Sequence, residues 1–181
     1  MSAPGPRVLQ IIADTDATPT NLAAVALHHG LTTSGFQVRT LALSAGSRPG
    51  LEHDVPTMAP SRRSFAARGQ FHHEARWSDV VVLHGLRSAT VATAPPLRSS
   101  HWPVPVIVAL WELPTSAPGR VATRILRAAD LVVAADEELE RFLDDRVGAA
   151  SHRLVAQVTL ADDRRRPDGE TWDDVLRSAV R

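Results

Sequence analysis

Short runs of branched apolar residues alternate along this chain with longer stretches that have helical periodicity. The apolar runs lie at 7–13, 36–43, 80–84, 104–110, 131–134 and 153–158. Most of them are apolar at consecutive positions, as expected of central parallel strands that are covered on both faces. The intervening stretches are long enough to form the crossovers that parallel strands require. The pattern therefore predicts an α/β fold, in which a parallel sheet of about six strands has helices on both faces.

Six stretches have the periodicity or the boundary residues of helices. Pro at the first helical position and Gly just beyond the last one are common helix boundaries. We expect helices from Pro19 to the turn at Gly35, at 61–77, at 88–99, between Gly119 and Ala129, at 137–147 and at 170–180. The stripe of the first helix that is expected to face the sheet consists of Leu22, Val25, Ala26 and His29.

A charged linker at 162–169 precedes the last predicted helix. We expect residues 1–166 to form a single Rossmann-like domain and residues 167–181 to form a C-terminal helix that docks back on it. One face of this helix is apolar, and it carries Trp172, Val175, Leu176 and Ala179. An apolar face of this kind must be buried against another element.

Composition excludes several classes of protein. The chain has 181 residues, 44% of them hydrophobic, so it can bury a core and is too apolar to be disordered throughout. The absence of cysteine excludes disulfides, thiolate metal sites and a cysteine nucleophile. No apolar run reaches transmembrane length, and the first strand follows the amino terminus without a signal peptide. We therefore expect a cytoplasmic protein.

The net charge is zero, but the charges are unevenly distributed. Residues 1–127 carry twelve Arg and seven acidic residues, whereas residues 128–181 carry eight Arg and thirteen acidic residues. Such a division can orient a protein partner or an anionic substrate. It is not the clustered basic face that nucleic-acid binding requires, so we expect no nucleic-acid partner.

Two histidine clusters suggest a metal site, but their spacing argues against one. The pair His28 and His29 and the triplet His72, His73 and Glu74 each fall within a predicted helix. Adjacent residues of a helix point in different directions, and the chain has no His-Glu-x-x-His motif. We therefore expect no metal ligand. No serine-centred nucleophile turn and no phosphate-binding loop motif occur either.

Three consecutive segments resemble motifs of a known family. They are 79–89 (DVVVLHGLRSA), 105–114 (PVIVALWELP) and 127–137 (RAADLVVAADE). They are similar to the N-terminal, acceptor-side domain of GT-B glycosyltransferases of family 4. Enzymes of that family have two Rossmann-like domains, and the second domain holds most of the donor sugar nucleotide. The resemblance covers residue 7 to about residue 166, and the tail helix resembles the family's last helix, which crosses back onto the first domain.

By this resemblance the chain corresponds to half of such an enzyme, without the donor-binding domain, and three hypotheses follow. The first hypothesis is an acceptor-binding subunit that acts in sugar transfer with a separate donor-binding chain. The second is a non-catalytic pseudo-glycosyltransferase that stabilises or regulates a partner enzyme. The third is a glycosyltransferase that works as a homodimer. We expect no cofactor in this chain, because the partner would bind most of any nucleotide sugar. The sugar-bearing acceptor is a further expected partner, and no catalytic residue is assigned.

Ligands of open α/β sheets bind beyond the carboxyl ends of the strands. The turns that follow the predicted strands are therefore the candidate binding positions in this chain. Asp14, Thr15 and Asp16 follow the first predicted strand. The family usually has a Gly-Gly pair here, through which the backbone approaches the donor phosphates, and this turn contains no glycine. The three residues are candidates for substrate binding. The alternative is a polar turn that caps the next helix.

His84, Arg87 and Ser88 follow the strand predicted at 80–84 and give the best match to the family. There, the His-Gly segment faces the cleft. Arg87 lies at the predicted start of a helix, where it could hold a phosphate or a sugar hydroxyl. The alternative is an ordinary strand-to-helix turn in which Ser88 is the N-cap.

Trp111 and Glu112 follow the strand predicted at 104–110. The family typically has His here, often followed by Asp or Asn. An indole cannot transfer a proton as an imidazole does, but it can stack on a sugar ring or pack under a loop. Glu112 keeps a carboxylate at this position. Glu137 is the last candidate, because the family often has Ser-Glu after the next strand, although helix capping alone would explain Asp136.

Overall fold

Strands and helices alternate along the chain. The computed structural model describes residues 5–48, 50–59, 65–93, 104–114, 119–146, 152–154 and 171–180. In chain order the elements are β1 (Arg7–Asp14), α1 (Pro19–Thr33), β2 (Gln37–Ser44), β3 (Thr57–Ala59), α2 (Phe65–Trp77), β4 (Val80–His84), α3 (Gly85–Thr93), β5 (Val106–Leu110), α4 (Arg120–Ala128), β6 (Leu131–Ala134), α5 (Glu137–Arg146), β7 (His152–Leu154) and α6 (Trp172–Ala179). The predicted linker and the predicted ends of the third helix and of the last strand lie outside the described residues.

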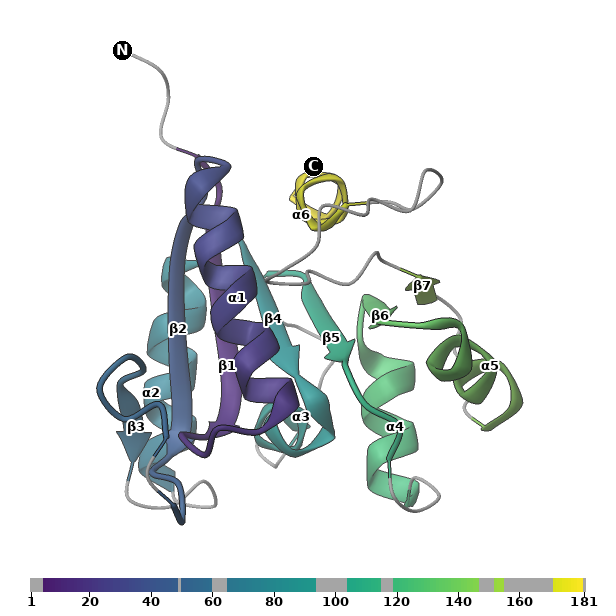
Figure 1. Ribbon diagram of the computed structural model, residues 1–181, viewed down its shortest axis with the longest axis horizontal. Helices are drawn as coiled ribbons and strands as arrows, with labels where there is room; N and C mark the ends of the chain where they lie inside the picture. Colours follow the sequence, from purple (N-terminus) through teal and green to yellow (C-terminus); the bar gives the residue numbers. More distant parts are fainter. Residues whose placement is uncertain are drawn as a thin grey trace.

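The strands form one parallel sheet in the order β3-β2-β1-β4-β5-β6-β7 (Figure 1). The predicted α/β, Rossmann-like fold with a parallel sheet of about six strands is confirmed. Within the described residues the sheet has seven strands, and three residues are described in each of the two edge strands, β3 and β7. The chain extends the sheet in one direction from β1 and then in the other direction from β4. The topological switch point therefore lies between β1 and β4, where Val8 is paired with Val80.

Side chains of the central strands point alternately to the two faces of the sheet, as the pleat requires. In β4, Val80 and Val82 belong to one apolar cluster, and Val81 and Leu83 belong to another. Residues of α1 and α6 pack in the first cluster, and residues of α2, α3, α4 and α5 pack in the second. Because helices cover both faces, every residue of β4 is buried, and the strand appears in the sequence as a continuous apolar run.

Helix α6 packs on the same face of the sheet as α1 and is seen end-on in Figure 1. It begins with a capping box, in which the hydroxyl of Thr171 accepts from the amide of Asp174 and the Asp174 carboxylate accepts from the amide of Thr171. Trp172, Val175 and Leu176 are buried in one cluster with residues of β5 and β6. These three residues belong to the apolar face that the sequence pattern indicated.

The predicted stripe of α1 is wrong at two of its positions. Leu22 is 43% exposed and His29 is also exposed, whereas Asn21 and Leu27 are buried. The cause is a hydrogen bond that a hydrophobic pattern does not reveal. The Nδ2 atom of Asn21 donates to the backbone oxygen of Asp14 at 2.9 Å, so a polar residue takes the buried position at the start of the helix.

Helix α3 begins at Gly85, three residues earlier than predicted. Gly85 has a φ of 73°, a conformation that glycine adopts without steric cost and that lets the chain turn directly from β4 into the helix. A Cβ atom at this position would also lie 3.3 Å from Cγ2 of Thr20. The alternative role of Ser88 as the N-cap is therefore wrong. Ser88 lies in the first turn, and its hydroxyl donates to the carbonyl of His84 at 2.6 Å.

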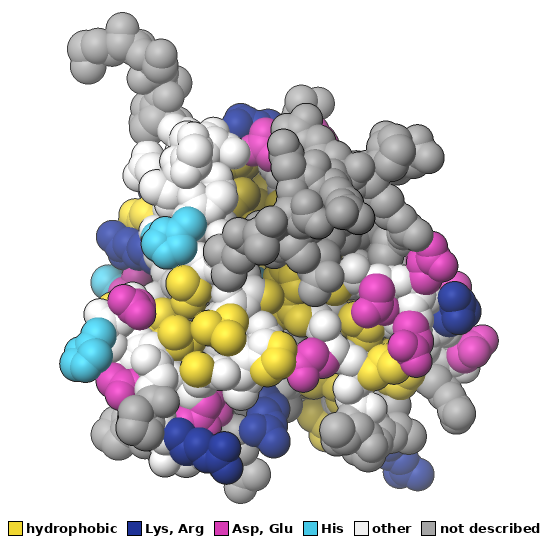
Figure 2. All heavy atoms as spheres, viewed as in Figure 1, with side chains coloured by type: hydrophobic (Ala, Val, Ile, Leu, Met, Phe, Trp, Pro, Cys, Tyr) yellow, Lys and Arg dark blue, Asp and Glu magenta, His cyan; other side chains and the backbone are white. Residues whose placement is uncertain are grey.

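Acidic side chains gather on the face over α5 (Figure 2). The first turn of this helix carries Glu137, Glu138 and Glu140, where the helix dipole stabilises negative charge. Oδ1 of Asp136 accepts from the amide of Leu139 at 2.8 Å, so Asp136 caps the helix. This helix accounts for much of the negative charge in the C-terminal part of the chain. Of the helices in the described ranges, none is both long enough and apolar enough to cross a membrane.

Replacement of Trp172 by Ala should lower the free energy of unfolding by about 3–5 kcal/mol, because it leaves a cavity between α6 and the sheet. Urea unfolding followed by circular dichroism would measure the change. Val180→Ala is the control, since Val180 ends the same helix and is 36% exposed, and it should change the free energy by less than about 0.5 kcal/mol. A Trp172→Ala variant as stable as the wild type would show that α6 is not docked in solution.

Candidate functional site

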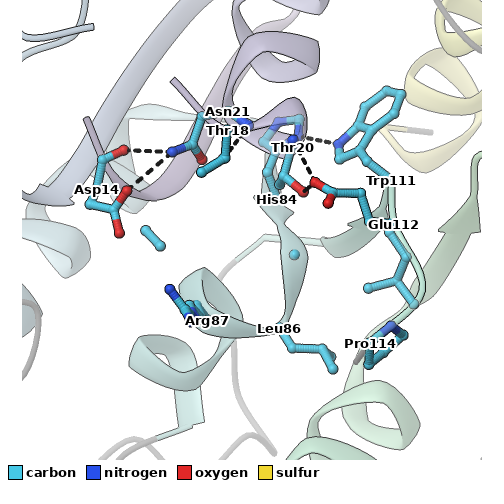
Figure 3. A pocket seen from close by; sticks show the side chains of 13 residues that line it. Asp14, Thr18, Thr20, Asn21, His84, Leu86, Arg87, Trp111, Glu112 and Pro114 are labelled. Carbon is cyan, nitrogen blue, oxygen red and sulfur yellow. Dashed lines mark hydrogen bonds between the residues drawn. The ribbon is translucent and has the colours of Figure 1, made fainter. Parts of the chain in front are cut away.

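A cavity of about 330 Å³ opens at the carboxyl ends of β1, β4 and β5 (Figure 3). It lies beside the switch point between β1 and β4, where open α/β sheets bind their ligands. Its volume is near the lower end of the about 300–1,000 Å³ that is typical of ligand pockets, so it suits a small ligand. The described residues that line it are Ala13, Asp14, Thr18, Thr20, Asn21, His84, Gly85, Leu86, Arg87, Leu110, Trp111, Glu112 and Pro114.

His84 and Trp111 form a buried part of the cavity wall. The indole N–H of Trp111 donates to Nδ1 of His84 at 2.8 Å, and the two rings are inclined by only 8°. An indole N–H can only donate, so Nδ1 carries no proton. Nε2 of the neutral ring is therefore protonated and donates to Oε1 of Gln10 at 2.7 Å. In the opposite orientation the Gln10 amide would donate to Nε2 of His84 and to the carbonyl of Ala24. That orientation would leave the imidazole without a proton on either nitrogen, so the donor from Trp111 favours the one in which Oε1 of Gln10 accepts.

The hydrogen bonds continue from Gln10 into the interior beneath α1. Nε2 of Gln10 donates to the hydroxyl oxygen of Thr40 at 3.3 Å, and the same hydroxyl is hydrogen-bonded to Nδ1 of His28 at 2.9 Å. The indole of Trp111 thus fixes the direction of three consecutive hydrogen bonds, which run from Trp111 through His84 and Gln10 to Thr40. Each buried polar group of this row has a partner, which is the condition for a stable polar network in a core.

His84 is only 1% exposed, and this burial lowers its pKa to about 3. The geometry also disfavours protonation of His84, because a proton on Nδ1 would directly face the indole N–H of Trp111. His84 is therefore neutral at physiological pH. A histidine in this state does not act as a general acid or base near neutral pH, where catalytic histidines titrate.

Trp111 also contacts the tail helix. Its ring stacks on that of Trp172, with the centroids 5.9 Å apart and the planes inclined by 27°. Both indoles are buried, and their stacking contributes beyond the burial of apolar area. Trp111 therefore has the packing role that the sequence left open as an alternative, and it lines the cavity as well. Through this residue the cavity wall is joined to α6.

The carboxylate of Glu112 occupies the N-terminus of α1. Its Oε1 atom accepts from the amide of Thr20 at 3.0 Å and from the Thr20 hydroxyl at 2.8 Å. The amide of Asn21 donates to the hydroxyl oxygen of Thr18, and Pro19 has no N–H to offer. A helix N-terminus is a common binding site for the phosphate of a ligand. Here the chain's own groups satisfy the donors of the first turn.

The three candidates at the carboxyl end of β1 differ in whether they line the cavity. Asp14 lines the cavity, and its Oδ1 atom accepts from Nδ2 of Asn21 at 3.2 Å. Thr15 and Asp16 do not line it and instead hold the loop after β2. The hydroxyl of Thr15 accepts from a backbone amide of that loop at 2.8 Å. The amide of Arg48 donates to Asp16 at 2.9 Å and lowers the pKa of the Asp16 carboxyl.

Arg87 and Ser88 lie in the first turn of α3 but differ in position. Arg87 is exposed and lines the cavity, whereas Ser88 is fully buried and does not. Figure 3 shows Asp14 and Arg87 at one side of the cavity and Glu112 at the other. Because His84 is neutral, the charged groups among the described lining residues are two carboxylates and one guanidinium. These residues therefore give the cavity a net negative charge.

Glu137 lies away from the cavity, two strands beyond β4 in the sheet. It begins α5 and forms an ion pair with Arg141, with 3.6 Å between Oε2 and the guanidinium. Five of the nine predicted site residues therefore meet at the cavity, and four do not. In the part of the chain that the structure describes, no group of three or more His, Asp or Glu side chains is arranged to hold a metal ion.

Sequence reasoning missed the first turn of α1, which contributes Thr18, Thr20 and Asn21 to the cavity. A signal for this turn was present in Pro19. A helix that starts there must place its first turn beyond the carboxyl end of β1, which is the ligand-binding edge of the sheet. Leu86, in the first turn of α3, and Pro114, in the loop after β5, also line the cavity, and the sequence pattern gave no separate signal for either.

Several solved structures have a similar fold, including the following two. One is a sucrose-phosphate synthase from Thermosynechococcus elongatus, with a TM-score of 0.54 and 15% identity over 83% of this chain and 88% of that chain. The other is MurG from Acinetobacter baumannii, with a TM-score of 0.51 and 15% identity over 90% of this chain. The match spans 47% of MurG, about half of its length. No family model and no curated protein matches the sequence.

Both neighbours are glycosyltransferases with the GT-B fold, so the resemblance to this fold that the sequence suggested is supported. At 15% identity the likeness concerns the fold alone. The activity of either neighbour does not transfer to this chain through the fold. Any functional conclusion must rest on the residues of the cavity.

The stability of the fold should decrease as the pH falls below about 6.5, in part because of His84. Its pKa is lowered on folding, so between about 6.5 and 3 the unfolded chain binds a proton that the folded chain does not. Within this window each pH unit should cost up to about 1.4 kcal/mol, and above it His84 should contribute no slope. Urea unfolding at several pH values measures this dependence.

The matched variant is His84→Asn, which keeps an acceptor for the Trp111 indole and does not titrate. Its free energy of unfolding should depend less steeply on pH than that of the wild type. Burial also lowers the pKa of His28, but that residue is present in both proteins and its effect cancels in the comparison. Parallel pH profiles for the two proteins would contradict a buried, neutral His84.

Proposed function

We propose that this chain is the acceptor-binding part of a glycosyltransferase with the GT-B fold, and that a separate chain binds the sugar-nucleotide donor. The observation that carries the proposal is the cavity at the switch point, which is lined by the carboxylates of Asp14 and Glu112 and by Arg87. Open α/β sheets bind ligands at this position, and both fold neighbours are glycosyltransferases.

Three side chains are proposed to hold the acceptor sugar. Asp14 and the Oε2 atom of Glu112 accept hydrogen bonds from sugar hydroxyls, and Arg87 donates to them. Trp111 and Leu86 supply apolar surface for the carbons of the ring. No catalytic residue is assigned, since His84 is buried and neutral. The role of these residues is to bind and orient the acceptor.

The donor is proposed to bind mainly to the partner chain. A diphosphate would find little to bind at the N-terminus of α1, where Glu112 and Thr18 already accept from the amides of the first turn. The nucleotide sugar is therefore a substrate that the partner holds, and this chain needs no cofactor of its own. The partner is a second glycosyltransferase chain or a second copy of this one.

We also propose that residues 1–166 form the acceptor-binding domain and that residues 167–181 complete it as a docked helix. The burial of Trp172, Val175 and Leu176 in the cluster that contains residues of β5 and β6 supports this division. The stacking of Trp172 on Trp111 places the helix next to the cavity wall. A domain of this kind would bind its ligand only with the tail in place.

The second candidate is a non-catalytic pseudo-glycosyltransferase that stabilises or regulates a partner enzyme. The hydrogen bond between Trp111 and His84 favours it, because it holds the imidazole of the cavity in a neutral state that does not exchange protons. The two candidates share the fold and the cavity. They differ in what the partner contributes and in whether a sugar is transferred.

Arg87→Ala should weaken the binding of an uncharged glycoside by about tenfold, because it removes a charged hydrogen-bond donor from the cavity. Ligand-observed NMR against a panel of methyl glycosides measures the affinities. Arg124→Ala is the control, since Arg124 is an exposed arginine of α4 outside the cavity, and it should change nothing. Equal affinity in the Arg87→Ala variant would remove Arg87 from the site. If the wild type bound no glycoside, the proposed acceptor site would be wrong.

A tagged pull-down from the native host, with mass spectrometry of the bound proteins, distinguishes the two candidates. Equimolar recovery of a chain with a donor-binding domain is expected for a split glycosyltransferase. Reconstitution with that chain should give sugar transfer, and Arg87→Ala should lower its kcat/KM for the acceptor by about tenfold, in line with the weaker binding. Recovery of a complete glycosyltransferase, with no transfer by this chain, would favour the regulatory role instead.

A further inference from the structure

Glu112 reaches the N-terminus of α1 from the loop after β5, 92 residues away in the sequence from Thr20. One carboxylate oxygen, Oε1, accepts from both the amide and the hydroxyl of Thr20, at 3.0 and 2.8 Å. Figure 3 shows this contact at the wall of the cavity, beside Trp111. The negative charge of Glu112 therefore lies where the helix dipole and the amide would otherwise attract an anion.

The net charge of the cavity also disfavours an anion. Asp14 adds a second carboxylate, and Arg87 is the single cation among the described lining residues. His84 adds no charge, because it is buried and hydrogen-bonded in its neutral form. A phosphate that entered would meet two carboxylates, and it would have to displace Glu112 to reach the amide of Thr20. An uncharged sugar meets neither obstacle, because its hydroxyls can donate to both carboxylates.

We propose that Glu112 is a specificity-determining residue, which keeps anionic groups out of the cavity and makes it selective for uncharged sugars over phosphorylated ones. The identity of the ligand as a sugar rests on the proposed function, whereas the exclusion of anions does not. Glu112 acts on an anion by direct repulsion and by occupying the donors of Thr20. It acts on an uncharged sugar as a hydrogen-bond acceptor.

A purely structural role for Glu112 would be to cap α1, and the test must separate the two roles. Glu112→Gln serves this purpose, since the amide oxygen of Gln can accept from the same Thr20 donors while the charge is lost. The cap is thereby retained and the exclusion is not. The control is Glu138→Gln, which makes the same change of charge at an exposed residue of α5, away from the cavity.

The experiment is a titration of the wild type and both variants with inorganic phosphate and, separately, with uncharged methyl glycosides. Two-dimensional ¹⁵N NMR gives the dissociation constants, and shifts of the Thr20 and Arg87 amides locate the binding. Glu112→Gln should bind phosphate at the cavity roughly five- to tenfold more tightly than the wild type, as expected from the loss of one nearby like charge. Glu138→Gln should match the wild type.

Equal phosphate affinity in the wild type and Glu112→Gln, whether weak or strong, would overturn the exclusion of anions. A wild type that binds glucose 6-phosphate more tightly than methyl glucoside would also overturn it, and the cavity could still be a sugar site. Conversely, a gain of phosphate binding in Glu112→Gln, with no glycoside bound by any protein, would leave the exclusion standing. In that case the proposed acceptor function would be wrong.

Discussion

The hydrogen bond from the indole of Trp111 to Nδ1 of His84, at 2.8 Å, determines much of the architecture around the cavity. Because the indole can only donate, it sets the tautomer of His84 and the orientation of Gln10 behind it. The same indole stacks on Trp172 and so joins the cavity wall to the tail helix. Loss of the bond would leave a polar group unsatisfied in the core and would loosen the contact with α6. One residue therefore links the packing of the sheet to the chemistry available in the cavity.

A second constraint is the contact of Glu112 with the N-terminus of α1, beside the switch point of the sheet. The topology brings the first turn of α1 and the loop after β5 together, and Glu112 fills the end of the helix. The result is a cavity that has hydrogen-bonding groups but lacks two features of a complete transferase site. Its imidazole does not titrate near neutral pH, and the donors of the adjacent helix end already have partners. Both features are consistent with the proposed role, in which this chain binds an acceptor and a partner holds the donor.

The sequence was sufficient for the fold because the strands are covered on both faces and appear as continuous apolar runs. Its failures involve contacts between residues that are far apart or that break a local rule. The early start of α3 depends on the backbone conformation of Gly85. The sequence pattern placed the start of this helix three residues later, at Ser88, with that serine as an alternative N-cap. The burial of Asn21 depends on a carbonyl of β1. The contact between Glu112 and Thr20 spans 92 residues, so no local pattern could reveal it. Five of the nine candidate residues meet at the cavity because the carboxyl ends of parallel strands lie at one edge of the sheet.

His84 is a neutral, buried part of the cavity wall, and it does not exchange protons near neutral pH. The most direct test is ¹⁵N NMR of the histidine rings as a function of pH, with His84 assigned from its absence in the His84→Asn variant. We expect a single tautomer for His84, with Nε2 protonated and Nδ1 unprotonated, that persists from neutral pH down to about pH 5. A ring that is protonated on both nitrogens at about pH 6, or that carries its proton on Nδ1, would contradict it.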